Sequence, residues 1–416
     1  MLPEIKKIDN ISVLHPALSA SKGGVKFYTI VAPAQDVVRI SLVFCAGVKY
    51  QTKSFVASAT ANLLTEGCGN YTSHEVAQML DFYGIYYDVT VDRDYCVITI
   101  CTLGRFTENA ISLLKDVILR PRFLQSELDV YASKRKAALT IEREKMKVRS
   151  REAFVKSIFG EKHDYAIFSN ATDYDNLTVD DLKQFYNKFY NRNNLFVVLS
   201  GNIGAEVIED VARLVDSLPK WEDMRRVTEN PTAKGEVIRV ENSESVQSSI
   251  NIGRVLFSRN HPDFIPMQVL ATVLGGYFSS RLMQNLREEN GYTYGVHAAA
   301  VNMQDSGYFI ISSELEKETT DKAIEQIFTE IEILKNELIG TEELDMVKRV
   351  IIGEVIRILD GPFGIADVTI ENIQNEVTNS ATEQMISEIG NITAEKLQQV
   401  AQKYLNREDL SVVIYS

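Results

Sequence analysis

The chain has 416 residues, which is long for a single hydrophobic core, and we therefore expect two domains. An apolar content of 45% and a charged content of 24% are typical of a soluble globular protein. The formal net charge of −13 argues against nucleic acid and anionic membranes as partners, because both attract basic surfaces.

Compartment signals are sparse. No apolar run approaches the roughly 18–20 residues that cross a bilayer, so we expect no membrane span. The opening residues MLPEIKKIDN lack the apolar core of a secretion signal. The cysteines have no CxxC spacing, which favours free thiols in a reducing compartment but leaves paired disulfides open; they are Cys45, Cys68, Cys96 and Cys101. We expect a cytoplasmic location, or a periplasmic one if a signal has been removed.

The first half begins with a strand and then a helix. Apolar runs and alternations predict strands over residues 36–48, 86–91 and 95–103. Between the first two strands, the stretch 55–73 opens with a small-residue helix that is expected to end at Gly67.

Two further helices are predicted before the middle of the chain. Thr72 and Glu75 have the spacing of a capping box, which places His74 in the exposed first turn of a helix. Residues 133–152 carry both signs of charge and are predicted to form one long helix with a solvated face.

The chain repeats itself at a distance of 215 residues. The segment NLTVDDLKQFYNKFYNRNNLFVVLSG (176–201) aligns without a gap with NITAEKLQQVAQKYLNREDLSVVIYS (391–416), and ten of the first 23 positions are identical. Glu-Leu-Asp recurs at 127 and 343, close to the same distance. A period this long indicates duplication of a whole domain.

The second half accordingly repeats the pattern of the first. Strands are predicted over residues 248–257, 294–301 and 307–315. We expect an α+β fold of two homologous domains, each a mixed, mainly antiparallel sheet with helices packed on one face. The predicted domains are 1–217 and 237–416, joined by the aperiodic linker 218–236.

The sequence lacks the common catalytic and nucleotide-binding motifs. The sequence contains no GxxxxGK[ST], no GxSxG and no strand followed by GxGxxG. The histidines are too far apart in sequence for a local metal-ligand pair; they are His15, His74, His163, His261 and His297. Ser58 and Asn62 share a face of the first helix, but no base accompanies Ser58, and close packing of the helix on a sheet is the better interpretation.

The stretch NLREENGYTYGV (285–296) is the most informative. Gly291 suits a left-handed position after a helix, and Arg287 lies in the last helical turn. Alternation puts Tyr292, Tyr294 and Val296 on one strand face and His297 on the other. Arg287 and Tyr294 are either an end cap and a cross-strand pair, or a functional pair.

The duplicated domain and the segment GGYFSSRLMQNLREENGYTYGV (275–296) resemble the pitrilysin/insulysin (insulinase) family of zinc metallopeptidases. The resemblance covers essentially the whole chain. It is to the short, two-domain subfamily, and it implies that one chain forms half of a clamshell-like chamber and a second chain the other half.

The resemblance also shows which parts are missing. The family binds zinc through HxxEH on the first helix and a distant Glu, and the Glu of the motif is the general base. Here Ser58 and Asn62 stand at the two His positions, and Ala61 stands at the base position. The distant Glu falls among Ala137, Ala138 and Leu139, with only Glu142 nearby, and the repeat positions of the second half are Val273, Gly276 and Tyr277. We expect no metal and no cofactor in this chain.

The family's other active-site pair is present. It has an Arg and, seven residues later, a Tyr that hold the substrate and the tetrahedral intermediate, and Arg287 and Tyr294 match this spacing. The resemblance therefore predicts a zinc-free subunit that supplies Arg287 and Tyr294 in trans to a homologous, HxxEH-bearing partner acting on peptides, with zinc in the partner and no activity alone.

Two other functions stay open. Members of such families also serve as core subunits of respiratory complexes, so the chain is alternatively an inert structural protein. It is also alternatively a homodimer that binds peptides without cleaving them.

Overall fold

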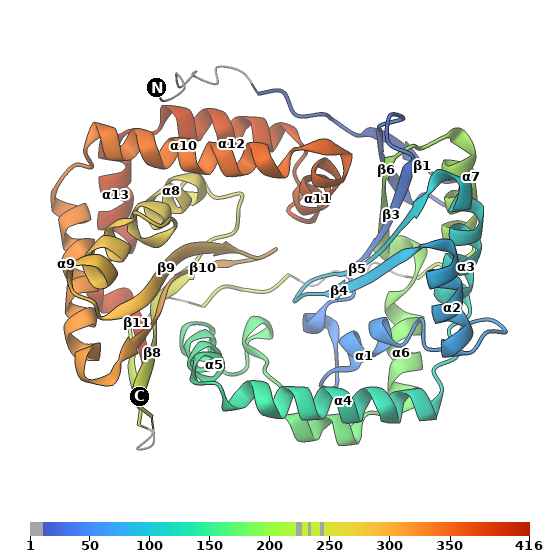
Figure 1. The fold of residues 1–416 in the computed structure, drawn as a ribbon, viewed down its shortest axis with the longest axis horizontal. Helices are drawn as coiled ribbons and strands as arrows, with labels where there is room; N and C mark the ends of the chain where they lie inside the picture. Colours follow the sequence, from blue (N-terminus) through green and yellow to red (C-terminus); the bar gives the residue numbers. More distant parts are fainter. Residues whose placement is uncertain (1–10, 222–226, 232–233, 242–244) are drawn as a thin grey trace.

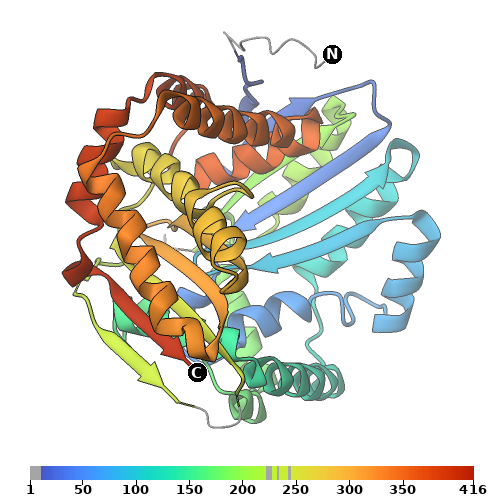
Figure 2. The same cartoon turned by 60° about the vertical axis from the view of Figure 1, so that its left-hand side comes forward.

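The computed structural model describes residues 11–221, 227–231, 234–241 and 245–416. These residues form two halves, each built on one sheet, and the sheets face one another across the middle of the molecule (Figures 1 and 2). Among the described helices, none is long and apolar enough to cross a bilayer. The four cysteines are free thiols in the structure, so no disulfide joins them.

The two sheets have the same topology. The first is ordered β1-β2-β6-β3-β5-β4 and the second β7-β11-β8-β10-β9. Without β1 the orders match strand for strand, and in each sheet one pair is parallel (β2 with β6, β7 with β11) while the others are antiparallel. The predicted α+β fold with duplicated, mainly antiparallel domains is confirmed.

The strand bounds lie close to those predicted from the sequence. The first sheet consists of β1 (Ala17–Ala20), β2 (Lys26–Val31), β3 (Val37–Phe44), β4 (Tyr86–Val91), β5 (Cys96–Leu103) and β6 (Leu195–Gly201). The second consists of β7 (Val237–Val240), β8 (Gln247–Leu256), β9 (Thr293–Asn302), β10 (Gly307–Glu316) and β11 (Ser411–Tyr415).

Helices cover the outer face of each sheet and bury the two main cores. The first core packs the sheet against α1 (Val56–Asn62), α2 (Ser73–Tyr83), α3 (Thr107–Leu119), α6 (Val179–Phe189) and α7 (Ala205–Asp216). The second packs its sheet against α8 (Phe264–Gly275), a π-helix (Met283–Glu289), α9 (Thr320–Asn336), α10 (Thr341–Ile358), α12 (Ser380–Asn391) and α13 (Ala394–Tyr404). The capping box at Thr72 is present, with its hydroxyl accepting from the Glu75 N–H.

The two halves also exchange helices, which the sequence did not predict. Helix α5 (Met146–Phe159) leaves the first half and packs on the inner face of the second sheet, where Phe154 and Ile158 meet Ile310. Helix α11 (Gly361–Gln374), 215 residues later, packs Ala366 and Ile370 on the inner face of the first sheet. Part of the inner face of each sheet is therefore covered by a helix of the opposite half.

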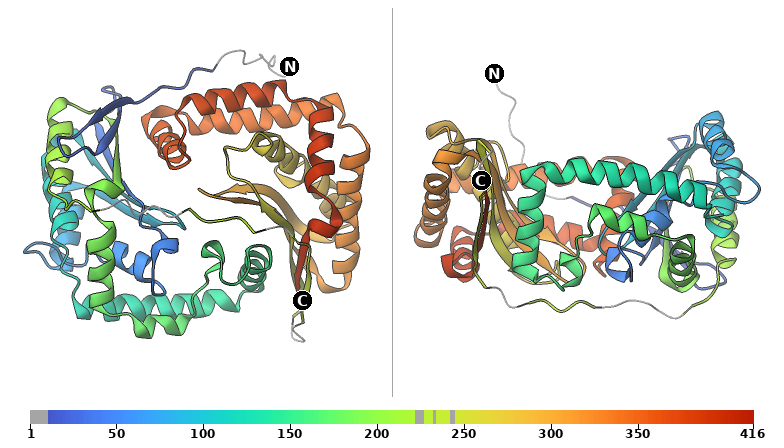
Figure 3. Two further views of the ribbon diagram at one scale, coloured as in Figure 1. Left: turned by 180° about the vertical axis from the view of Figure 1, so that it is seen from behind. Right: turned by 90° about the horizontal axis from the view of Figure 1, so that it is seen from below.

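The prediction of one continuous helix over residues 133–152 is wrong. It is two helices, α4 (Gln125–Glu144) and α5, separated by Lys145 in extended conformation. Figure 3 shows α4 running from the first half toward the second and α5 turning off beside the second sheet. The equivalent corner between α10 and α11 has sequence signals, a left-handed Gly361 and Pro362 in the first turn, but the corner at Lys145 has neither.

Candidate functional site

Helix α1, where the family resemblance puts its zinc motif, is a packed structural helix. It ends at Asn62, five residues before the predicted end at Gly67. Ala57, Ala59 and Ala61 are fully buried against the first core. The base position, Ala61, therefore has neither a functional group nor access to water.

The two polar positions of α1 are occupied by local hydrogen bonds. The Ser58 hydroxyl donates to the Phe55 carbonyl at 3.3 Å, and the Asn62 amide donates to the Ser58 carbonyl at 2.7 Å. The Phe55 ring stacks on Tyr174 with centroids 3.9 Å apart. Burial raises the pKa of the neighbouring Tyr131 phenol to about 12, so this hydroxyl stays protonated. Ser58 therefore has no activating base.

The donor set does not fit zinc. On α4, Ala137 and Ala138 are exposed methyl groups, Leu139 packs against the first core, and Glu142 is exposed. In the second half, Val273 is buried, Gly276 ends α8, and Tyr277 packs against the second core. Among the described residues, no three His, Cys, Asp or Glu side chains gather where they could hold a metal ion. A hydroxyl, an amide and methyl groups are not the thiolate, imidazole or carboxylate ligands that zinc takes.

Arg287 lies on an unusual element, the π-helix Met283–Glu289. Such turns are rare and are often found at functional sites. Gly291 follows with φ of 65°, the left-handed conformation predicted for it. The guanidinium lies over the ring of Phe278, 5.0 Å from its centroid, and its Nε is 3.4 Å from Glu288. No hydrogen bond from Arg287 to a helix carbonyl exists among the described residues, so it does not act as an end cap.

Tyr294 lies on a β-bulge. The register between β9 and β10 shifts between Ser313 and Leu315, so that Tyr294 and Gly295 together stand opposite Glu314. The Thr293 hydroxyl supports this geometry: it donates to the Glu314 carbonyl at 2.6 Å and accepts from the Gly295 N–H at 3.0 Å. The Tyr294 side chain is 92% exposed.

The bulge overturns the strand faces expected from alternation. Val296 is buried in the second core, whereas Tyr294 points to the face of Glu314. His297 pairs with Ser312, two residues from Glu314, and is therefore on the same face as Tyr294 rather than the opposite one. This is the face whose Ile310 packs on α5, toward the middle of the molecule.

The backbones that carry Arg287 and Tyr294 are joined, although no contact between the two side chains is found in the described part of the chain. The Tyr292 N–H donates to the Leu286 carbonyl at 2.8 Å, and Leu286 is fully buried. The two backbone segments are therefore connected, and both functional groups are accessible. Phe278, which lies against Arg287, was missed from the sequence; it is an apolar residue, 67% exposed, two positions after the Gly-Gly pair that ends α8.

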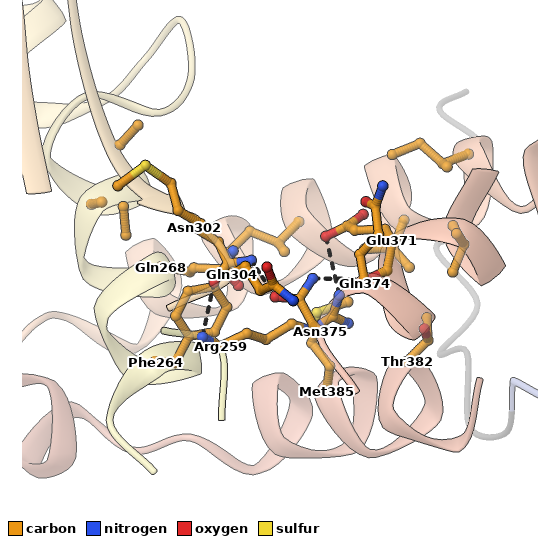
Figure 4. Close-up of a pocket in the computed structure, with 18 of the residues that line it drawn as sticks. Arg259, Phe264, Gln268, Asn302, Gln304, Glu371, Gln374, Asn375, Thr382 and Met385 are labelled. Carbon is orange, nitrogen blue, oxygen red and sulfur yellow. Dashed lines mark hydrogen bonds and ion pairs between the residues drawn. The ribbon is translucent and has the colours of Figure 1, made fainter. Parts of the chain in front are cut away.

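A cavity of about 710 Å³ opens beside this scaffold, between α8, β9 and α11. Figure 4 shows its neutral amide side chains, Gln268, Asn302, Gln374 and Asn375, above the apolar Phe264 and Met385. Arg259 pairs with Glu371 at 3.1 Å, and the Asn302 amide donates to Asn375 at 2.7 Å. Its wall combines apolar side chains and neutral amides with charged groups of both signs, a composition that could bind a peptide; the charged groups are Asp92, Arg93, Asp94, Arg259 and Glu371.

The comparisons with known proteins relate the chain to zinc proteases and to their inactive homologues. Residues 176–351 match a family model described as "Peptidase M16 inactive domain". The chain is 22% identical over 408 residues to the "uncharacterized zinc protease YmxG" of Bacillus subtilis, covering 95% of this chain and 97% of that protein. It is 25% identical over 306 residues to the "non-peptidase homolog YmxG" of Helicobacter pylori, covering 72% and 69%.

The fold is shared with a solved relative. The crystal structure of an M16 peptidase inactive domain from Pseudomonas fluorescens superimposes with a TM-score of 0.90 at 23% identity, covering 97% of this chain and 98% of that one. This chain is therefore similar to M16 peptidases, in sequence over residues 176–351 and in fold over nearly its whole length. The chain lacks the HxxEH motif and is similar to proteins that are named inactive or non-peptidase. The insulinase-type resemblance found in the sequence is confirmed.

Proposed function

We propose that the chain is the zinc-free subunit of a two-chain M16 peptidase and supplies Arg287 and Tyr294 in trans to the active site of its partner. The partner, a homologous subunit with an intact HxxEH, would supply the metal and the general base. The observation that carries the proposal is the exposure of Tyr294 on a β-bulge, in a chain whose α1 has no group able to activate water.

The residues of this chain suit the remaining half of the chemistry. A phenol O–H can donate a hydrogen bond to the oxyanion that develops when water attacks a peptide carbonyl. A guanidinium can hold a substrate carbonyl or carboxylate through charge-assisted hydrogen bonds. Phe278 restrains the Arg287 guanidinium from one side and leaves its other donors free.

The test uses the chain and its companion together. A partner should co-purify with this chain from its source, and the mixture should cleave peptides. Tyr294→Phe in this chain should then lower kcat by about a hundredfold or more, because one oxyanion donor contributes roughly 2.7–4 kcal/mol. Full activity in the Tyr294→Phe complex would refute the role in trans.

The alternative is a chain that binds peptides without turnover, alone or as a homodimer, and the cavity beside α8 favours it. In that case the isolated chain should bind unfolded peptides measurably by calorimetry. Substituting Gln268 and Gln374 in the cavity wall should weaken that binding, and Tyr294→Phe should not.

A further inference from the structure

The two halves meet at a buried ionic cluster formed by the tips of two hairpins. The turn of the β4–β5 hairpin carries Asp94, and the turn of the β9–β10 hairpin carries Gln304 and Asp305. Between them lies the Lys49 side chain, which is fully buried. Its ammonium is 2.6 Å from Asp94, 3.0 Å from Asp305 and 3.1 Å from the Gln304 amide oxygen. We name these residues, with Tyr165, the hairpin junction.

The remaining polar groups of the hairpin junction are also paired. The Tyr165 hydroxyl donates to Asp94 at 3.0 Å and accepts from the Asp305 N–H at 3.2 Å. The Thr228 N–H donates to Asp305 at 3.1 Å. Gln304 continues the contact by donating to the Tyr95 hydroxyl at 2.7 Å. The cluster thus joins five separated stretches of the chain.

Lys49 is held in register with the first hairpin by its backbone. The Lys49 N–H donates to the Arg93 carbonyl at 2.9 Å, and the Gly47 N–H donates to the Asp94 carbonyl at 3.1 Å. A Cβ on Gly47 would overlap the Asp94 backbone, so glycine is required for this close approach. The ammonium is therefore part of the first half, aimed at the second.

The electrostatics make the arrangement specific. Burial alone lowers the pKa of Lys49, but the Asp94 charge and its hydrogen bonds offset this, and the pKa lies above its ordinary value. A buried ion pair contributes little net stability, because desolvation of the charges opposes their attraction, yet removing one partner is strongly unfavourable. Such a cluster therefore acts mainly by selecting one geometry.

We propose that Lys49 is a positioning residue that locks the β9–β10 hairpin to the first half and thereby sets where Tyr294 stands. Tyr294 lies at the end of β9 away from the junction, so tilting the hairpin about its tip would displace it. The junction claim concerns the isolated chain, and only its consequence for Tyr294 rests on the proposed function.

The first test measures hydrogen exchange by mass spectrometry in the isolated full chain. Lys49→Met keeps the length of the side chain and leaves two buried carboxylates without their cation. Exchange should rise about tenfold or more in residues 86–103 and 293–316 together, because both hairpins lose one anchor. Asp305→Asn, a milder change, should give a smaller rise in the same two segments.

The matched control is Lys396→Met, which removes a lysine that pairs with Asp263 at 2.7 Å inside the second half. It should leave exchange at residues 86–103 unchanged. If both junction variants raise exchange only around residue 49, or evenly over the whole chain, the junction does not couple the hairpins and the proposal is overturned.

The second test reads the consequence for Tyr294 in the complex with the peptidase partner. Lys49→Met should lower kcat by about tenfold or more with a small change in KM, because a displaced oxyanion donor weakens only the transition state. An unchanged kcat beside loosened hairpins would overturn the positioning of Tyr294. Absence of activity in the wild-type complex would instead contradict the proposed function. The exchange experiment alone would then test whether Lys49 couples the two hairpins.

Discussion

Helix α1 and the Arg287–Tyr294 segment are the two stretches that the family resemblance aligns with a catalytic centre, and they differ in burial and in backbone geometry. On α1 the key positions are small and buried, and the polar side chains Ser58 and Asn62 bond to their own backbone. On the other segment, Tyr294 is exposed on a bulge that costs ladder hydrogen bonds, and Arg287 stands on a rare π-helix.

This difference is the physical reason for assigning the proposed function to the Arg287–Tyr294 segment and not to α1. Packing alone explains α1, because alanines allow a helix to approach a sheet closely. Packing does not explain an exposed tyrosine on an irregular strand, since irregular backbone generally marks a functional requirement. The contrast leads to four predictions, in order of decreasing effect.

The largest effect is expected where α1 is made to resemble a catalytic helix. Ala61→Glu places a carboxylate at a fully buried position, and the free energy of unfolding should fall by about 3 kcal/mol or more. Urea denaturation measures it. Ala137→Glu on exposed α4 is the control and should change stability by less than about 0.5 kcal/mol. Equal stability of both variants would show that α1 is not the packed element described above.

The sealed environment of α1 should also appear in alkaline stability. The pKa of Tyr131 is raised from 10.0 to about 12, so the stability it contributes is present below pH 10 and is lost as the pH rises toward 12. Two pH units correspond to about 2.7 kcal/mol. Tyr131→Phe should flatten the fall of stability between pH 10 and 12, measured by denaturation at a series of pH values, whereas the exposed Tyr86→Phe should not. An unchanged slope for Tyr131→Phe would place this phenol in contact with solvent.

At the Arg287–Tyr294 segment, Arg287→Ala should lower the catalytic efficiency of the complex with the peptidase partner. Loss of a hydrogen bond from a charged group amounts to about 1.5–3 kcal/mol, so kcat/KM should fall by roughly ten- to 150-fold. Steady-state kinetics with a short peptide measure the loss. Arg349→Ala, at an exposed arginine of α10, should leave kcat/KM unchanged. Parallel losses in both variants would indicate a general effect of surface charge.

The smallest effect is expected at Phe278. Phe278→Leu keeps an apolar side chain but removes the ring that lies against Arg287, an interaction of about 0.5–1 kcal/mol at an exposed site. Activity of the complex should fall about two- to fivefold while the thermal unfolding temperature stays constant. A lowered unfolding temperature would instead assign Phe278 to folding rather than to the orientation of Arg287.

Much of the fold followed from local patterns. The strand over residues 86–91 was predicted to the residue, and the long-range repeat indicated the duplicated topology. The sequence did not indicate which of the distant elements pack against one another. The mixed charges of residues 133–152 indicated a solvated helix face, but nothing in the sequence indicated that α5 packs on the sheet of the other half. The corner at Lys145 lacked any Gly or Pro to mark it.

The candidate site could be predicted from the sequence only in part. Spacing and family resemblance selected Arg287 and Tyr294. The left-handed conformation predicted for Gly291 is confirmed. The sheet face on which the Tyr294 side chain lies could not be predicted, because a single extra residue in β9 reverses the alternation on which the prediction relied. Phe278 and the hairpin junction are tertiary contacts, and no local signal combines Lys49 with residues 45 and 256 positions away, Asp94 and Asp305.

The central claim is a division of labour between two chains, and metal content measured together with activity tests it most directly. The purified chain alone should hold no stoichiometric zinc and should leave peptides intact, while its complex with an HxxEH-bearing companion should hold zinc in the companion and cleave them. One zinc ion per isolated chain, with proteolysis in the absence of any other protein, would contradict the account.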